Sequence, residues 1–288
     1  MSKIIISVEA TADITPEIQQ RYNIAVAPME YIVDGKSHST IDGVDASAFY
    51  GAMRDGAITK TSLVNEAAAR EHLESLLSGG AEVLHFCISS HLSGTYASFV
   101  SAAAELDCTY PGKVMIVDAR TASCGILLMA VACCIKASEG ATLNELFDYA
   151  QKMRDNTSSL FTVDSLTYLA RTGRISKGAA IFGNAIHLKV AMRVTEDGEL
   201  APYKKVLSRR RALAELVSRT KSMYVPDFDQ ILIAHADCEQ DANYVAAEVE
   251  AQLGLNVQVV ALGPVIGCHS GPGTLAVFFT SDGKQIKG

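Results

Sequence analysis

The sequence predicts an α/β fold in two domains, and two of its features carry that prediction. In the first half, short apolar segments typical of buried strands alternate with amphipathic helical segments, as in a parallel sheet covered on both faces. From about residue 158 the pattern changes, and residues 190–206 are typical of a β-hairpin that turns at Glu196-Asp197-Gly198. We therefore expect a parallel-sheet α/β N-terminal domain over residues 1–155. A mixed-sheet α/β C-terminal domain, with helices on one face, is expected over residues 156–288.

The individual elements follow from hydrophobic periodicity and from turn and cap residues. Strands are expected at 4–8, 83–88, 114–118, 160–163, 230–236, 257–262 and 275–279, and residues 25–33 are expected to be extended up to Asp34-Gly35. Helices are expected at 15–22, 45–54, 65–77, 97–104, 142–153, 165–170, 208–223 and 242–253. The uncharged segment 121–135 is expected to be a buried helix, because it falls short of the ~18 to 20 residues of a membrane span.

The composition narrows the class of protein. Hydrophobic residues make up 49% and charged residues 20% of the chain, and the formal net charge of −7 argues against nucleic acid as a partner. The seven cysteines never form C-x-x-C and lie in apolar segments, so we expect buried reduced thiols and no metal site or disulfide framework. The apolar run at 4–8 is too short for a signal peptide, and a cytoplasmic location is expected.

The segment 86–99 is the first candidate site, because an apolar strand there runs into a hydroxyl-rich turn that opens a helix. Such a turn leaves backbone N–H groups unpaired at the positive end of the helix dipole. Ser89, Ser90, Ser93 and Thr95 add hydroxyl donors, so the expected ligand group is an anion or a carbonyl. Helix capping by Ser93 alone would also explain these residues.

The segment 263–273 is the second candidate site. It follows a strand, holds four glycines and two prolines, and contains His269 as its only side chain with an ordinary pKa near neutrality, so we expect an irregular loop that can approach a ligand closely. A core histidine is the plainer alternative for His269. The P-loop motif G-x-x-x-x-G-K-[ST] is absent, and no ATP site is expected on this chain.

Three further stretches carry polar or basic side chains. Thr61 and Ser62, before a helix, could supply hydroxyl groups to the same anion, although helix capping nearby is an equal explanation. Arg171 and Arg174 flank Gly173 at the expected end of a short helix. A basic run is either a solvated helix face or a docking patch for an acidic partner. It consists of Lys204, Lys205, Arg209, Arg210 and Arg211.

These motifs, in this order, resemble the DegV family of bacterial fatty-acid-binding proteins, and the resemblance covers nearly the whole chain. The matching stretches are Glu9-Ala-Thr-Ala-Asp-Ile14, Asp34-Gly35, Thr61-Ser62, Ser89-Ser-x-x-Ser-Gly-Thr-Tyr96, Val117-Asp118, Leu169-x-Arg-Thr-Gly-Arg-Ile-Ser176 and Ile266-Gly-x-His-x-Gly-Pro-Gly273. The resemblance implies a two-domain α/β protein that holds one long-chain fatty acid and needs no cofactor. It also implies a non-catalytic role, as the acyl-carrying subunit that presents the carboxyl group to a separate ATP-binding fatty-acid kinase.

The resemblance also implies residue roles. Thr61 (or Ser62) and Ser93, with the adjoining Gly94 and Thr95, are expected to bind the carboxylate, with His269 beside it. Arg174, with Arg171, is expected on a surface near the site of phosphoryl transfer. The chain departs from the family pattern in three places, at Glu9-Ala10, Leu63-Val64-Asn65 and Lys189-Val190, and we expect details of its carboxylate contacts to differ accordingly.

For the fatty-acid tail we expect an apolar tunnel. Its expected lining is Leu127, Leu128, Val131 and Ile135 of the buried helix, with Phe161, Tyr168 and Phe182. The same residues could simply be core.

Two alternatives differ in class from a kinase subunit. Ser93, Asp118 and His269 follow the chain order of an α/β-hydrolase triad, which would indicate an esterase, but His91 stands where the nucleophile motif G-x-S-x-G needs glycine. The other alternative is a lipid shuttle without a kinase partner.

Overall fold

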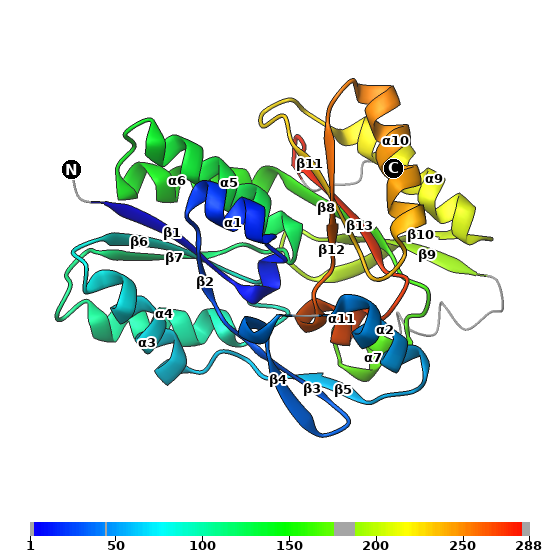
Figure 1. Cartoon of the computed structure of the whole chain (residues 1–288). Helices are drawn as coiled ribbons and strands as arrows, with labels where there is room; N and C mark the ends of the chain where they lie inside the picture. The colour runs from blue at the N-terminus through cyan, green and yellow to red at the C-terminus, as the bar shows by residue number, and fades with distance from the viewer. Residues whose placement is uncertain (1–2, 44, 176–187, 284–288) are drawn as a thin grey trace.

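The computed structural model describes residues 3–43, 45–175 and 188–283, and it contains two large sheets and one small sheet (Figure 1). The first half forms a parallel sheet and the second half a mixed sheet, as the sequence predicts. The change from one to the other falls where helix α6 (Leu143–Asn156) ends and strand β8 (Thr157–Thr162) begins. The domain boundary near residue 155 stays a prediction, because one apolar cluster joins elements from both halves.

The parallel sheet has the strand order β2-β1-β6-β7. Its strands are β1 (Ile4–Glu9), β2 (Ala25–Ala27), β6 (Glu82–Cys87) and β7 (Val114–Asp118). Successive side chains alternate between its faces, so Val8 packs toward α1 (Pro16–Tyr22), α5 (Cys124–Ser138) and α6, whereas Val83 packs toward α3 (Glu66–Leu77) and α4 (Thr95–Leu106). Both faces are therefore covered, which explains why these strands are almost continuously apolar.

The mixed sheet has the strand order β10-β9-β8-β13-β11-β12, antiparallel except for its last pair. Its further strands are β9 (Lys189–Val194), β10 (Leu200–Val206), β11 (Ile231–His235), β12 (Val257–Ala261) and β13 (Leu275–Thr280). Helices α9 (Arg209–Met223) and α10 (Glu239–Leu253) cover one face, and Figure 1 shows them together at one end of the molecule. The predicted hairpin at 190–206 is confirmed as β9 and β10.

Helix α5 lies between the two large sheets. It contacts β1 and β6 of the parallel sheet and β8, β11 and β13 of the mixed sheet, and every residue from Cys124 to Cys133 is buried. A helix packed on opposite sides needs apolar residues all round, which is the pattern that predicts a buried helix here. No helix in the described part of the chain is long and apolar enough to cross a membrane.

The small antiparallel sheet, ordered β4-β3-β5, extends from the first half. It consists of β3 (Glu30–Val33), β4 (Lys36–Ser39) and β5 (Thr59–Thr61), with the 3₁₀ turns η1 (Ala10–Ala12) and η2 (Thr40–Asp42) and helix α2 (Ala46–Arg54) nearby. Asp34 and Gly35 both have positive φ, 49° and 83°, and so form the two-residue turn that joins β3 to β4. The sequence analysis identified the turn but missed β4 and β5, which are short and polar.

The prediction that residues 263–273 form an irregular loop is wrong, because helix α11 (Pro264–Ser270) lies at the centre of this segment. Pro264 occupies the first helical position, where a missing N–H costs nothing. Gly267 lets the helix approach Tyr50, since a Cβ there would lie 2.4 Å from the Tyr50 hydroxyl oxygen. Helix α11 packs against α2, β5 and the short helix α7 (Thr167–Arg171).

Four of the seven cysteines are buried, as expected. Cys108 is exposed, however, and Cys134 and Cys238 are partly exposed, so burial was wrong for these three; all seven are free thiols.

Candidate functional site

A pocket of about 230 Å³ lies where the carboxyl ends of the parallel strands meet a face of the mixed sheet. Thr11, Ile88 and Ala122 line it, and they follow β1, β6 and β7 respectively. The chain runs from β1 outward to β2 and later from β6 outward to β7, so the strand order reverses between β1 and β6. Such a reversal leaves a crevice outside the strand ends, and this is where open α/β sheets bind ligands.

One side of the pocket is an apolar wall, formed mainly by the mixed sheet. Phe161 on β8 pairs with Ala276 on β13, and Phe278 lies two residues further along the same face. Further apolar side chains come from neighbouring strands, from the residue that follows β12 and from the first turn of α11. They are Val194, Leu200, Leu262, Val265 and Ile266.

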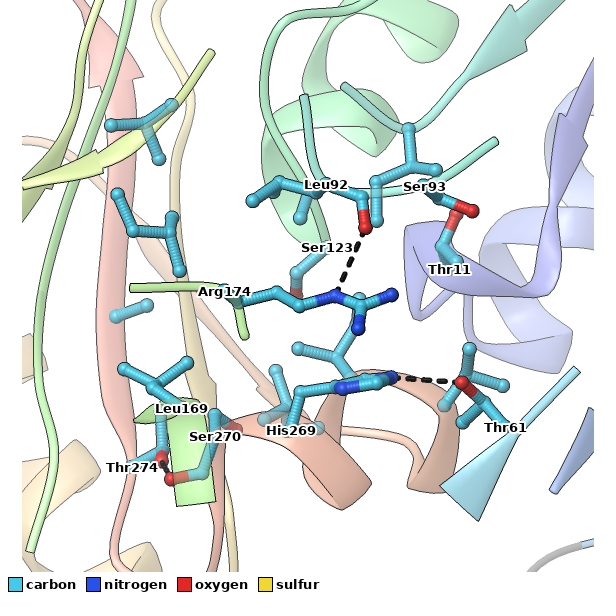
Figure 2. Close-up of a pocket in the computed structure, with 18 of the residues that line it drawn as sticks. Thr11, Thr61, Leu92, Ser93, Ser123, Leu169, Arg174, His269, Ser270 and Thr274 are labelled. Carbon is cyan, nitrogen blue, oxygen red and sulfur yellow. Dashed lines mark hydrogen bonds between the residues drawn. The ribbon is translucent and has the colours of Figure 1, made fainter. Parts of the chain in front are cut away.

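The opposite side is a polar rim, and it contains six of the eight predicted site residues. They are Thr61, Ser62, Ser93, Gly94, Arg174 and His269. Figure 2 shows the Arg174 guanidinium between Ser93 on one side and the His269 ring on the other, with Thr61 beside that ring. The other two predicted residues, Thr95 and Arg171, do not line the pocket.

Thr95 is fully buried behind Ser93, and its contacts orient the serine hydroxyl. The Ser93 and Thr95 oxygens are 3.0 Å apart, and Ser93 Oγ also accepts from the Thr95 backbone N–H at 3.3 Å. Thr95 Oγ1 accepts from the Val64 N–H, so its own hydrogen is available for Ser93. Ser93 Oγ thus accepts two hydrogen bonds from Thr95, and its own hydrogen remains available to donate to a ligand.

Thr61 and His269 are 208 residues apart in sequence, and their side chains form a hydrogen bond of 2.8 Å between Oγ1 and Nε2. Burial, with Arg174 and Arg171 nearby, lowers the pKa of His269 to about 4, so the ring is neutral near pH 7. If the Thr61 hydroxyl donates its hydrogen to a ligand, it must accept the hydrogen bond from His269. Nε2 of the neutral ring then carries the ring hydrogen and donates it in the bond to Thr61. Nδ1 is then an acceptor, and it is buried with no hydrogen-bond partner among the described residues.

Arg174 is half-buried in the rim rather than on an outer surface. Its Nε donates to the Leu92 carbonyl at 3.1 Å, and its NH1 donates to the Thr172 carbonyl at 2.5 Å. Two backbone acceptors thus fix the guanidinium, whose charge faces the pocket (Figure 2). Arg171 instead stacks over Tyr168, with 5.3 Å between guanidinium carbon and ring centroid, outside the pocket.

Sequence analysis missed the support behind the rim, formed by Asp13 and Ser123. The Ser123 hydroxyl donates to Asp13 at 2.5 Å, and the other Asp13 oxygen accepts from the Gly263 N–H at 2.8 Å. Ser123 has a positive φ of 57°, a strained backbone that these contacts hold in place. Asp13 thereby ties the start of α5 to the start of α11. Ser270, also missed, lines the pocket with a buried hydroxyl that has no partner in the described residues.

The positions that depart from the family pattern mostly lie away from the pocket. Glu9 and Ala10 do not line it, whereas Leu63 does and is half exposed. Asn65 caps helix α3, and Lys189 pairs with Asp164 at 2.9 Å. Of these departures, only Leu63 can change contacts with a ligand directly.

Most of the predicted tunnel lining does not line this pocket. Leu127, Leu128, Val131 and Ile135 belong to the α5 core, and Tyr168 also lies outside the pocket lining. Of the predicted set only Phe161 lines the pocket, and Phe182 lies outside the described residues. The reason is that α5 meets the pocket only at its start, through Ala122 and Ser123, and its later turns are enclosed by the two sheets.

The hydrolase triad is not assembled. Asp118 accepts from the Ser90 hydroxyl at 2.6 Å, whereas Ser93 pairs with Thr95 and His269 with Thr61. Each member of the expected triad therefore has a different partner, and no hydrogen bond joins the three among the described residues.

The basic run is partly neutralised by acidic neighbours. Lys204 pairs with Glu215, and Arg209 pairs with Asp241 at 2.8 Å. A docking role for this run stays a prediction.

Together, the fold and the pocket define an α/β protein of the small-molecule-binding class, with one apolar side and one polar side to its site. The family model described as "Uncharacterised protein, DegV family" matches residues 3–282. A DegV domain-containing protein of Clostridium perfringens is 32% identical over 292 residues, covering 99% of this chain and 100% of that protein. The chain belongs to the DegV family.

Two solved structures are similar over nearly their whole length. A Thermus thermophilus structure described as fatty acid binding of a DegV family protein has a TM-score of 0.87 and 25% identity, covering 97% of this chain and 99% of that one. A DegV lipid-binding protein from Thermotoga maritima has a TM-score of 0.84 and 26% identity, covering 98% and 100% respectively.

Proposed function

We propose that this chain binds one long-chain fatty acid, with the acyl tail against the apolar wall and the carboxylate at the polar rim. The observation that carries the proposal is the division of a single pocket into an apolar and a cationic, hydroxyl-lined side. The related structures described as fatty-acid-binding and lipid-binding support it.

The tail supplies most of the binding free energy in this proposal. Burying about fourteen methylenes at ~0.8 kcal/mol each contributes on the order of 11 kcal/mol before the costs of ordering. The cavity of about 230 Å³ is smaller than the ~300 Å³ at which small-molecule pockets usually begin. We therefore expect a long acyl chain to widen the pocket when it binds.

The rim sets the orientation of the carboxylate. Arg174 provides the positive charge, and Ser93 and Thr61 provide hydroxyl donors, each charge-assisted hydrogen bond being worth ~1.5 to 3 kcal/mol. These contacts are too few to dominate affinity, but together they distinguish a carboxylate head group from an apolar end.

For the biological role, we propose that the bound carboxylate is presented to a separate ATP-binding kinase subunit. One carboxylate oxygen would attack the γ-phosphorus of ATP, forming an acyl phosphate while ADP leaves. The chain has no P-loop motif, and its rim includes the exposed Gly94 and the half-exposed Leu63, which a partner can reach. This chain would then hold and orient the acyl group, and the partner would supply the nucleotide.

Native mass spectrometry of the purified protein, followed by denaturation and identification of released molecules, tests the binding function. We expect one long-chain fatty acid per chain, or uptake of one labelled palmitate by delipidated protein. A protein that is empty and also refuses palmitate would overturn the proposal. Fluorophosphonate labelling that is lost in Ser93→Ala would then indicate the hydrolase instead.

The partner role needs a separate test. The fatty-acid-loaded chain is mixed with candidate kinase subunits and ATP, and acyl phosphate is trapped as the hydroxamate with hydroxylamine. Formation that requires both proteins supports the kinase role. Binding of fatty acid without acyl phosphate, with every candidate kinase encoded in the same genome, would leave the lipid shuttle as the function.

A further inference from the structure

A second polar cluster lies within the core, on the face of the parallel sheet that α3 and α4 cover. Its members do not line the pocket, although Glu9 accepts a hydrogen bond from Thr11, which does. Ser7 on β1 is paired in register with His85 on β6, and the next residues on the same face of each strand are Glu9 and Cys87. All four side chains are completely buried, each with 0% exposure.

Three ligand atoms meet within this cluster. A carboxylate oxygen of Glu9, a ring nitrogen of His85 and the Cys87 sulfur all lie within 4.8 Å of one another. Two of the buried atoms, Glu9 Oε1 and His85 Nε2, have no hydrogen-bond partner among the described residues. The Cys87 thiol hydrogen-bonds to the Glu9 carboxyl group, which brings the sulfur and the carboxyl group together. Buried polar atoms are nearly always paired, so two unpaired atoms in one buried cluster leave room for a further ligand.

The remaining atoms of these side chains are held by neighbours. His85 Nδ1 bonds to Ser7 Oγ at 2.9 Å, Ser7 Oγ bonds in turn to His72 Nε2 at 2.8 Å, and the His85 ring stacks on Phe99 with centroids 3.8 Å apart. Glu9 Oε2 accepts from the Thr11 hydroxyl at 2.9 Å. Outer contacts of this kind orient the side chains that ligate a metal in known sites.

We propose that Glu9 Oε1, His85 Nε2 and Cys87 Sγ bind one Zn²⁺ ion. Zinc takes sulfur, nitrogen and oxygen ligands at about 2.0 to 2.3 Å, which places neighbouring ligand atoms roughly 3.3 to 3.8 Å apart in a tetrahedral site. The three ligand atoms now lie within 4.8 Å of one another, so binding would draw them closer together. The mixed donor set disfavours Mg²⁺ and Ca²⁺, which take oxygen ligands.

The charge balance also favours a divalent ion at this depth. Zinc binding releases the Cys87 thiol proton, together with any proton that the Glu9 carboxyl group holds, to solvent. One thiolate with one carboxylate then neutralises the two positive charges. A neutral assembly avoids an uncompensated charge in the core. With three protein ligands, a water molecule would take the fourth position. The ion would join β1 to β6 at their carboxyl ends.

Cobalt(II) substitution tests the site on the full-length protein after chelator dialysis. We expect one Co²⁺ per chain, a sulfur-to-cobalt charge-transfer band, and visible absorption of the strength typical of four-coordinate cobalt. The band is expected to disappear in Cys87→Ser and to persist in Cys133→Ser, which changes an equally buried thiol on α5. It is also expected to persist in Cys108→Ser, which removes the exposed thiol.

No charge-transfer band in the folded wild type, or a band that survives Cys87→Ser, would overturn the proposal. If Cys87→Ser does not fold, X-ray absorption at the zinc edge of zinc-loaded wild-type protein decides without any variant. One sulfur among the ligands is expected there, and a shell of nitrogen and oxygen alone would contradict the site.

Discussion

The two sides of the pocket are built in different ways. The apolar wall comes largely from neighbouring strands of one sheet, where Phe161 and Ala276 are partners in register. The polar rim comes from segments far apart in sequence, and the contact between Thr61 and His269 spans 208 residues. The wall offers area, on which affinity for an acyl chain depends, whereas the rim offers a few directed contacts, which depend on the whole fold being in place.

The largest expected effect on affinity comes from a bulky substitution in the apolar wall. Ala276→Phe places a ring where the tail would lie, and excluding about five methylenes would cost ~4 kcal/mol, or roughly a 1,000-fold loss of affinity for palmitate. Isothermal titration with delipidated protein measures it. Ala201→Phe is the matched control, because Ala201 follows Leu200 on β10 and its side chain points to the other face of the sheet. Equal losses in both variants would contradict a tail site on this face.

Removing the charge of the rim should have the next largest effect. Arg174→Ala loses a charge-assisted contact worth ~1.5 to 3 kcal/mol, so palmitate affinity should fall by about 10- to 150-fold. Arg171→Ala removes an arginine three residues away that stacks on Tyr168 outside the pocket, and it should bind nearly as the wild type does. If the two variants lose affinity equally, the carboxylate does not lie at Arg174.

A smaller loss is expected from the hydroxyl group of the rim. Thr61→Val keeps the shape of the side chain but removes the donor. A loss of ~1.5 kcal/mol, the lower end of the range for a charge-assisted hydrogen bond, corresponds to about 12-fold weaker binding. Thr61→Ser retains the hydroxyl and should restore most of the affinity in the same titration. Weak binding by Thr61→Ser as well would show that the methyl group, and not the hydrogen bond, matters at this position.

The support behind the rim should change stability with pH while leaving affinity near the wild-type value. Burial raises the pKa of Asp13 to about 7, although hydrogen bonds from Ser123 and Gly263 oppose the rise. The unfolded chain releases this proton near pH 4, so the stabilisation is complete below about pH 4 and is lost as the pH rises through about 7.

The side chain of Asp13→Asn cannot ionise. Between pH 5 and 7 the unfolding free energy of this variant should therefore fall less steeply than that of the wild type, the two slopes differing by ~1.4 kcal/mol per pH unit. Urea unfolding at several pH values measures the slope. Ser123→Ala keeps the carboxyl group and loses a bond that favours its ionised form, so the decline should continue to higher pH in that variant. An unchanged slope in Asp13→Asn would mean that Asp13 does not hold the proton.

Local patterns in the sequence were sufficient for most helices and strands, although not for β4, β5 and α11, and they selected six residues that line the pocket. Thr15, Asn65 and Ser208 cap helices where their types predict it, because a cap depends on residues within one turn. Thr61, Ser93 and His269 could be selected because hydroxyl and imidazole groups stood at strand ends or in turns, where parallel strands place binding groups.

Contacts between distant segments were beyond the reach of those patterns. Whether an apolar residue lines a cavity or fills the core depends on what faces it, and so Leu127 and Leu128 were assigned to a tunnel although both sheets enclose them. The same holds for Asp13, whose partners lie 110 and 250 residues away, and for His85, which only strand register brings beside Ser7 and Glu9. The sequence by itself determined most of the segments that become strands and helices, because hydrophobic period and capping act over a few residues. Only the tertiary structure decided which polar groups share a site, because that depends on packing across the whole chain.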